Sequence, residues 1–238
     1  SVADPVRYWD VNVAGTIALV NVLQRTGIRD LIFSSSCTVY GNPEVLPLTE
    51  DSPIGPTNPY GRSKQAVESI LGDLATADPR WRIALLRYFN PVGAHPSGRI
   101  GEDPKDTPNN LLPYVMQVAV GRRPELTVFG GDYPTADGTC IRDYIHVMDL
   151  AEGHRAALDS IDRITGCRAI NLGTGQGTSV LDLVSFASEA CGHPVPYAIG
   201  PRRPGDAVAC WAEVDLAADL LGWQATRSIA DACADAWT

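Results

Sequence analysis

The sequence lacks the signatures of disulfide-bonded, metal-binding and membrane proteins. Its six cysteines are scattered without a CxxC motif, and no histidines or cysteines cluster at metal-ligand spacing. This usage indicates reduced thiols in a cytoplasmic protein and no metal site. The sequence has neither a signal peptide nor an apolar run of membrane length, so we expect no membrane partner.

Positive charge is also scarce. The 238 residues carry a net charge of −9, and Lys64 and Lys105 are the only lysines in a chain that otherwise uses arginine. An acidic protein is a poor general binder of nucleic acid, and an anionic ligand would need arginines placed locally against that field. The length suits one large domain or two small ones.

Apolar periodicity in the first part of the chain predicts alternating helices and strands. A helix over 4–27 ends at Gly27, since glycine is common just after a helix. It is followed by a buried strand over 30–34, a helix over 58–74 and an apolar strand over 81–89. This order is typical of the second half of a doubly wound, Rossmann-type parallel sheet, so the fold class is α/β.

The usual beginning of such a sheet is missing. A doubly wound fold normally opens with a strand and a GxGxxG turn, and none precedes these elements. The nearest match, GTGQG at 173–177, has its third glycine one residue early and lacks the acidic residue that ribose binding requires. We interpret it as a tight strand-to-helix turn.

The composition changes near residue 93 to loops rich in proline, glycine and aspartate. We therefore predict a Rossmann-type part over 1–93 and a smaller α/β domain over 94–238. A strand over 168–172 is expected to return from the second part to the main sheet. The other predicted elements are helices over 109–120, 147–158, 215–221 and 229–237, and a strand over 126–130.

The segment NPYGRSK at 58–64 combines a helix start with a reactive pair. Asn58 suits the N-cap and Pro59 the first helical position, so Tyr60 and Lys64 share one helix face. The ammonium is expected to lower the phenol pKa from about 10 and to make Tyr60 a general base. A solvated lysine on an ordinary amphipathic helix is the simpler alternative. The hydroxyl-rich strand end at 34–40 favours the reactive pair.

Seven segments resemble one enzyme family: FSSSCTVYG (33–41), NPYGRSK (58–64), LLRYFNPVGAHPSG (85–98), PNNLLPYV (108–115), VFGGDYPTADGT (128–139), IRDYIHVMDLA (141–151) and PRRPGD (201–206). Together they are similar to the UDP-glucose 4-epimerases of the extended short-chain dehydrogenase/reductase group. The resemblance covers essentially the whole chain. It implies NAD as cofactor and reversible epimerisation at C4 of UDP-galactose and UDP-glucose through a 4-keto sugar, in galactose metabolism.

The resemblance also implies a longer protein. The βαβ units that carry the glycine-rich NAD loop in this family should precede Ser1, and residues 1–238 alone should be inactive. Residues 1–93 would then be the remainder of the NAD-binding domain and residues 94–238 the UDP-sugar-binding domain. The full-length protein is expected to be a homodimer.

A catalytic set follows from the same resemblance. Tyr60 matches the base for the C4 hydroxyl, and Lys64 matches the residue that holds the nicotinamide ribose and keeps Tyr60 acidic. Ser36 matches the residue that bonds the reacting hydroxyl and relays its proton. Further matches near the sugar and the nicotinamide are Thr38, Tyr88 and Phe89.

The resemblance places the UDP-sugar on a second set of residues. Arg142 and Arg203 match a clamp on the diphosphate, which suits a guanidinium fork, and Asp206 matches an acceptor for a ribose hydroxyl. Each arginine could instead be a surface ion-pair partner. The other matching contacts are Asn90, Asn109, Asn110 and Leu111, together with Thr127, Val128 and Phe129 on a strand that borders the uracil.

Cys210 matches a position that faces the sugar. Family members with a small residue there also accept N-acetylated sugars, so the resemblance implies activity on UDP-N-acetylglucosamine and UDP-N-acetylgalactosamine. A buried packing cysteine is the alternative for this position.

Two other functions stay open. Nucleotide-sugar dehydratases of the same group use the Tyr/Lys pair, but they need an acid and a base beside the strand-end hydroxyls. At those places this chain has Cys37, Thr38 and Val39, without a carboxylate. The chain could also be an inactive fragment or a paralogue that binds a UDP-sugar without catalysis.

Overall fold

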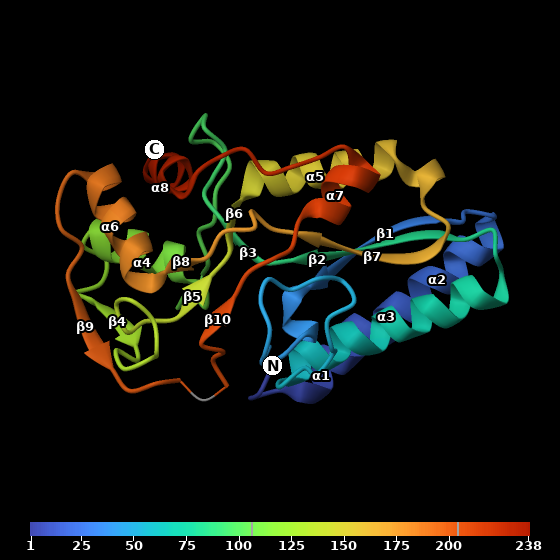
Figure 1. Ribbon diagram of the computed structural model, residues 1–238, viewed down its shortest axis with the longest axis horizontal. Helices are drawn as coiled ribbons and strands as arrows, with labels where there is room; N and C mark the ends of the chain where they lie inside the picture. Colours follow the sequence, from blue (N-terminus) through green and yellow to red (C-terminus); the bar gives the residue numbers. More distant parts are fainter. Residues whose placement is uncertain (106, 204) are drawn as a thin grey trace. The chain divides into compact units, whose positions relative to one another are not determined.

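The computed structural model describes residues 1–105, 107–203 and 205–238, and the chain divides into two compact units (Figure 1). Unit 1 comprises Ser1–Tyr88, Gly153–Leu172 and Glu213–Trp223. Unit 2 comprises Phe89–Glu152, Gly173–Ala212 and Gln224–Thr238. The sequence predicted a boundary at residue 93, with the strand over 168–172 returning to the main sheet. The chain passes from unit 1 to unit 2 where strand β2 ends, and two later segments belong to unit 1 again. Gly153–Leu172 supplies a strand of its sheet, and Glu213–Trp223 supplies a helix that covers the sheet.

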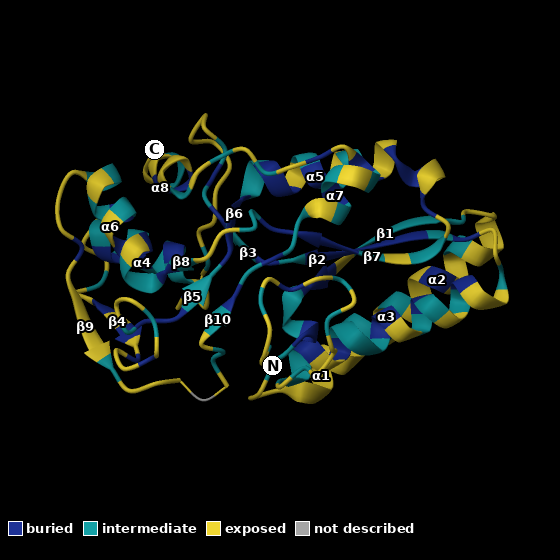
Figure 2. Cartoon of the chain, viewed as in Figure 1, coloured by how far each residue is buried: buried dark blue, intermediate teal, exposed yellow. Residues whose placement is uncertain are grey.

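Unit 1 is organised on a three-stranded parallel sheet. Strands β1 (Asp30–Ser36), β2 (Arg82–Tyr88) and β7 (Gly166–Leu172) are hydrogen-bonded in that order. The strand expected over 168–172 therefore lies in this sheet, beside β2. Residues 83–86 of β2 are buried, as the apolar run of a strand covered on both faces predicts (Figure 2).

Helices cover both sides of this sheet. Figure 1 shows α2 (Gly15–Thr26) and α3 (Pro59–Ala77) on one side and α7 (Asp215–Leu221) on the other. The helix predicted over 4–27 is divided into α1 (Pro5–Trp9), a π-helical turn (Asp10–Ala14) and α2, and it ends at Gly27 with a φ of 79°. Short 3-10 turns cover Cys37–Val39 and Ile161–Arg163.

Helix α3 starts as the sequence predicts. The Asn58 side chain accepts a hydrogen bond from the backbone N–H of Gly61 at 2.9 Å, and Pro59 opens the helix. A Cβ atom at Gly61 would lie 2.8 Å from the carbonyl oxygen of Thr38, so glycine lets this turn approach the end of β1. Val67 and Leu71 are fully buried one turn apart, and each such side chain contributes roughly 1.5–3 kcal/mol.

Unit 2 combines short sheets with helices. Its strands are β3 (Asn90–Val92), β4 (Leu126–Phe129), β5 (Ile141–Arg142), β6 (Tyr144–His146), β8 (Thr178–Ser179), β9 (Tyr197–Gly200) and β10 (Ala209–Cys210). They form the sheets β10-β5-β8, β3-β6 and β4-β9. The helices are α4 (Leu111–Ala119), α5 (Val147–Asp159, which continues into unit 1), α6 (Val180–Cys191) and α8 (Ile229–Trp237). Helices α4, α6 and α8 share one apolar core, which fixes the elements that surround the cavity described below.

Candidate functional site

Tyr60 and Lys64 lie on the first two turns of α3, beside the carboxyl end of β1. The Lys64 Nζ donates to the carbonyl oxygen of Ser34 at 2.8 Å. It lies 4.9 Å from the centre of the Phe33 ring and 5.7 Å from the centre of the Tyr60 ring. The ammonium is therefore held against the strand end, four residues from the phenol on the same helix.

Ser36 is the last residue of β1, which runs two residues beyond the predicted strand over 30–34. Its hydroxyl oxygen accepts from the Thr38 backbone N–H at 3.2 Å and from the Thr38 hydroxyl at 2.9 Å. Ser36 is also hydrogen-bonded to the Tyr60 side chain. The structure thus brings Ser36, Thr38, Tyr60 and Lys64 together in unit 1.

The pKa of Tyr60 is raised, whereas the sequence predicted that Lys64 would lower it. Burial raises the pKa of Tyr60 above its ordinary value, although the hydrogen bond from Ser36 acts in the opposite direction. Burial also lowers the pKa of Lys64. The reason is that both groups lose water, while the ammonium is directed to the Ser34 carbonyl rather than to the phenol oxygen.

Tyr88 joins the same group from β2, where it is paired in register with Ser36. Its hydroxyl donates to Ser34 Oγ at 2.7 Å and contacts Nε2 of His154. The ring centres of Tyr88 and His154 are 5.1 Å apart. Burial raises the pKa of Tyr88. The next residue, Phe89, is buried at the start of unit 2.

These side chains suit the hydroxyl groups of a dinucleotide ribose. The parallel strands β1 and β2 end together, and ligands of open α/β sheets bind outside the carboxyl ends of the strands. The groups present there are one ammonium, which has three donors, and two phenols and a serine hydroxyl. Each of these hydroxyls can donate or accept a hydrogen bond. Lys64, Tyr60 and Ser36 therefore have the donors and acceptors that could bind the hydroxyls of a cofactor ribose.

Unit 2 contains a cavity of about 530 Å³. It collects the predicted substrate side chains of this unit, with the exception of Cys210. They are Asn90, Asn109, Asn110, Leu111, Thr127, Val128, Phe129, Arg142, Arg203 and Asp206. A cavity of this volume, lined by apolar side chains together with amides, two arginines and an aspartate, has the properties of a small-molecule site.

The two arginines of this cavity differ in their surroundings. Arg142, on β5, donates from Nη1 to the Ile141 carbonyl at 2.8 Å. Arg203 pairs with Asp206 at 2.9 Å, and its guanidinium lies 5.7 Å from the Phe129 ring centre. Its side chain is 56% exposed, so this pair is weak and a diphosphate can compete for the guanidinium. The neighbouring Pro204 of the PRRPGD segment lies outside the described residues.

Cys210 is buried on β10, where it is paired in register with Arg142. Its backbone carbonyl accepts from the Asp143 N–H at 3.0 Å. It is not among the described side chains that line the cavity, although its register partner is. The structure therefore places Cys210, the residue predicted to face the sugar, next to a residue that lines the cavity.

The GTGQG segment wraps around a buried carboxylate. Asp143 accepts from the Thr174 N–H at 2.8 Å, the Thr174 hydroxyl at 2.7 Å and the Gly175 N–H at 3.0 Å. It also accepts from the Ala212 N–H at 3.1 Å. Since Asp143 directly follows Arg142, this turn anchors the strand that carries the arginine. The backbone donors at Thr174 and Gly175 are thus already used by a side-chain carboxylate.

Several side chains at the two sites were not predicted. His154 contacts Tyr88, and the cavity is also lined by Thr107, Pro108, Tyr114, Cys140, Tyr144 and Val180. Tyr144 lies within the IRDYIH segment and Cys140 directly precedes it, and this segment is the sequence signal that could have indicated them. Nothing local to His154 distinguishes it from a surface residue of a helix.

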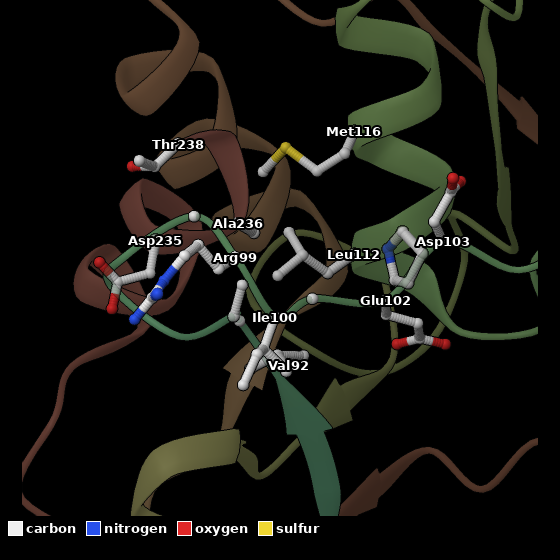
Figure 3. A pocket seen from close by; sticks show the side chains of 15 residues that line it. Val92, Arg99, Ile100, Glu102, Asp103, Leu112, Met116, Asp235, Ala236 and Thr238 are labelled. Carbon is white, nitrogen blue, oxygen red and sulfur yellow. The ribbon is translucent and has the colours of Figure 1, made fainter.

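A second, smaller cavity of about 240 Å³ lies elsewhere in unit 2 (Figure 3). Val92, Ile100, Leu112 and Met116 supply its apolar lining, and none of the predicted substrate residues is among the described residues around it. Across the described residues, no group of histidine, cysteine, aspartate or glutamate side chains has the arrangement of a metal site. In the same part of the chain, no helix is long and apolar enough to cross a membrane.

Comparisons with known proteins agree on one family. A family model described as "NAD dependent epimerase/dehydratase family" matches residues 1–173. The UDP-glucose 4-epimerase of Bacillus subtilis (strain 168) is 56% identical over 237 residues, which are 100% of this chain and 70% of that protein. The mouse (Mus musculus) UDP-glucose 4-epimerase is 54% identical over 238 residues, covering 100% and 69%.

A solved structure is equally similar. The crystal structure of UDP-glucose 4-epimerase from Bifidobacterium longum, in complex with NAD+ and UDP, aligns with a TM-score of 0.95 at 54% identity. The alignment covers 100% of this chain and 71% of that one.

Proposed function

The chain belongs to the NAD dependent epimerase/dehydratase family, and from this we propose that it acts in the NAD-dependent, reversible epimerisation of UDP-galactose and UDP-glucose at C4. The observation that carries the proposal is the cluster of Ser36, Tyr60 and Lys64 at the end of the parallel sheet. The cavity lined by Arg142 and Arg203 supports a nucleotide-sugar substrate.

The chain's own residues would perform the proton steps. Tyr60, as phenolate, takes the proton of the C4 hydroxyl, either directly or through the Ser36 hydroxyl, and returns it when the sugar is reduced again. When bound, NAD would supply the acceptor for a hydride from the sugar carbon and the donor that returns it, and its oxidised ring would add a positive charge beside Tyr60 and Lys64. Lys64 holds a ribose hydroxyl and orients Tyr60. Arg142 and Arg203 hold the diphosphate, with Arg203 released from Asp206.

Dehydration is the less favoured chemistry within the family. Elimination of a sugar hydroxyl needs an acid and a base beside the strand end. The 3-10 turn there consists of Cys37, Thr38 and Val39, none of which is a carboxylate.

The central test is Tyr60→Phe in the protein expressed from its natural reading frame. We expect kcat for UDP-galactose to fall by about 10²–10⁴-fold, because a general base is removed. UDP binding should change little, since the phenol is not part of the cavity in unit 2. Assays of epimerisation measure kcat, and calorimetric titration measures UDP binding. Near-normal turnover of Tyr60→Phe would remove Tyr60 from the reaction.

We also propose that residues 1–238 by themselves do not bind NAD tightly. The chain spans 70% of the Bacillus subtilis relative, and its sequence contains no GxGxxG motif to cradle a pyrophosphate. Fluorescence titration of this polypeptide with NAD should show no submicromolar binding. Affinity in that range would contradict the proposal.

The proposal includes a homodimer in the cytoplasm, as part of galactose metabolism. The six cysteines, all within the described residues, form no disulfide bond, which supports a reducing compartment. Cell fractionation with an antibody to the protein tests the location, and recovery in an oxidising compartment would contradict it. Exposed apolar side chains on α1 and α2 support the dimer.

A further inference from the structure

Unit 1 contains a buried polar network that the proton steps do not use. Glu68 on α3 and Arg87 on β2 form a two-pronged ion pair, with Arg87 Nε 3.0 Å from Oε1 and Nη2 2.7 Å from Oε2. Their side chains are 9% and 7% exposed. Ser35 on β1 donates its hydroxyl to the same Oε1 at 2.5 Å. One carboxylate thus joins α3 to two strands.

The other donors of Arg87 are directed to the segment after β1. Its Nη1 donates to the Tyr40 hydroxyl at 2.9 Å and to the Glu50 carbonyl at 3.0 Å. Tyr40 in turn donates to Asn171 Oδ1 at 2.6 Å, on β7. The guanidinium therefore has a defined partner on each side and a single orientation.

The network lies one residue before the reacting groups on both strands. Ser35 is paired in register with Arg87, and the next pair is Ser36 with Tyr88. On α3, Glu68 comes four residues after Lys64 and eight after Tyr60, so the three lie along one side of the helix. A rotation or shift of α3 at Glu68 would consequently move Tyr60 away from Ser36 and Lys64 away from the Ser34 carbonyl.

We propose that Glu68 and Arg87 are positioning residues for the reaction: their ion pair fixes α3 against β1 and β2 so that Tyr60 meets Ser36. This inference rests on the proposed epimerase function, whose reacting groups it serves. Stability alone does not require the pair, because a buried ion pair can often be replaced by apolar side chains without loss. A guanidinium–carboxylate fork does specify geometry.

Two variants separate positioning from stability. Glu68→Asp keeps the charge and draws the carboxylate back by one methylene group. We expect kcat for UDP-galactose to fall about 10- to 100-fold, since a displacement of about 1 Å can cost that much. KM should stay within about twofold, because the cavity of unit 2 is unchanged. The double variant Glu68→Met with Arg87→Met leaves no unpaired buried charge, so it should fold with a melting temperature closer to the parent value than either single Met variant, and it should still show the low kcat.

A matched control breaks another ion pair between the same strands. Arg82 and Asp30 pair at 2.6 Å at the amino ends of β2 and β1, where both side chains are more than one-third exposed. Arg82→Met should leave kcat and KM unchanged. All variants are made in the protein expressed from its natural reading frame.

A measurement without turnover tests the geometry directly. NMR of protein labelled with ¹³C in the tyrosine rings gives a resonance for Tyr60, assigned by its loss in Tyr60→Phe. We expect this resonance to move in Glu68→Asp and in the double variant, but not in Arg82→Met. A double variant that keeps both its melting temperature and the parent kcat would overturn the inference, as would an unmoved Tyr60 resonance. If the parent lacks epimerase activity, the proposed function fails while the resonance still decides the positioning.

Discussion

Tyr60 shows how burial and charge compete at a single residue. An ammonium lowers the pKa of a phenol when it lies within about 4–6 Å of the phenol oxygen, and burial of the phenol acts in the opposite direction. Here the Lys64 ammonium donates to Ser34, and burial raises the pKa of Tyr60. The positive charge of an oxidised nicotinamide ring would favour the phenolate against this effect of burial.

Cys210 carries a prediction about substrate range. Its thiol is far smaller than a phenol, and its register partner Arg142 lines the larger cavity of unit 2. We expect the full-length protein to epimerise UDP-N-acetylglucosamine as well as UDP-galactose. Cys210→Tyr should abolish activity on the N-acetylated sugar through steric overlap and keep activity on UDP-galactose. The ratio of the two kcat/KM values measures the effect.

Cys233 provides the control for this test, since it is also a buried thiol of unit 2 but lies on α8. Cys233→Ala should leave the ratio unchanged. The hypothesis that the size of residue 210 sets the substrate range is wrong if the parent has no activity on UDP-N-acetylglucosamine, or if Cys210→Tyr does not change the ratio.

At the scale of an element, α3 places the reactive pair through its first turn. The Asn58 cap satisfies the Gly61 N–H, and Tyr60 lies between these two residues. Asn58→Ala should lower the free energy of unfolding by about 1 kcal/mol. It should also lower kcat, because fraying of this turn displaces the phenol.

Helix α8 offers a matched control, since Ser228 caps it through the Asp231 N–H at 3.1 Å. Ser228→Ala should have a similar cost, about 1 kcal/mol in urea unfolding, without lowering kcat. An Asn58→Ala protein that is destabilised but turns over normally would show that the cap does not position Tyr60.

At the scale of the whole molecule, exposed apolar side chains on the amino-terminal helices support association of two copies. Leu19 and Val22, three residues apart on α2, are 48% and 45% exposed, and Val11 is 62% exposed. Leu19→Glu should therefore convert a dimer into monomers, because an unpaired charge would be buried at the interface.

Sedimentation velocity distinguishes the two states. Val45→Glu changes an equally apolar residue that is 75% exposed in the loop after β1, and it should leave the dimer intact. If Leu19→Glu sediments as a dimer, the face formed by α2 is not the interface.

The sequence by itself determined the elements whose formation depends on neighbours a few residues away. The cap at Asn58, the end of α2 at Gly27 and the helices α7 and α8 were predicted correctly, because capping and apolar periodicity are local. The predicted substrate side chains that line the cavity of about 530 Å³ in unit 2 came from resemblance of motifs and not from periodicity.

Only the tertiary structure decided what depends on burial and on contacts between distant segments. An arginine within the apolar strand over 81–89 gives no sign that its partner is Glu68, nineteen positions away on a helix. The sign of the Tyr60 pKa shift also depends on packing, because desolvation requires knowing which residues cover the phenol. The π-helical turn at Asp10–Ala14 likewise follows from packing against α3, which no short window of sequence contains.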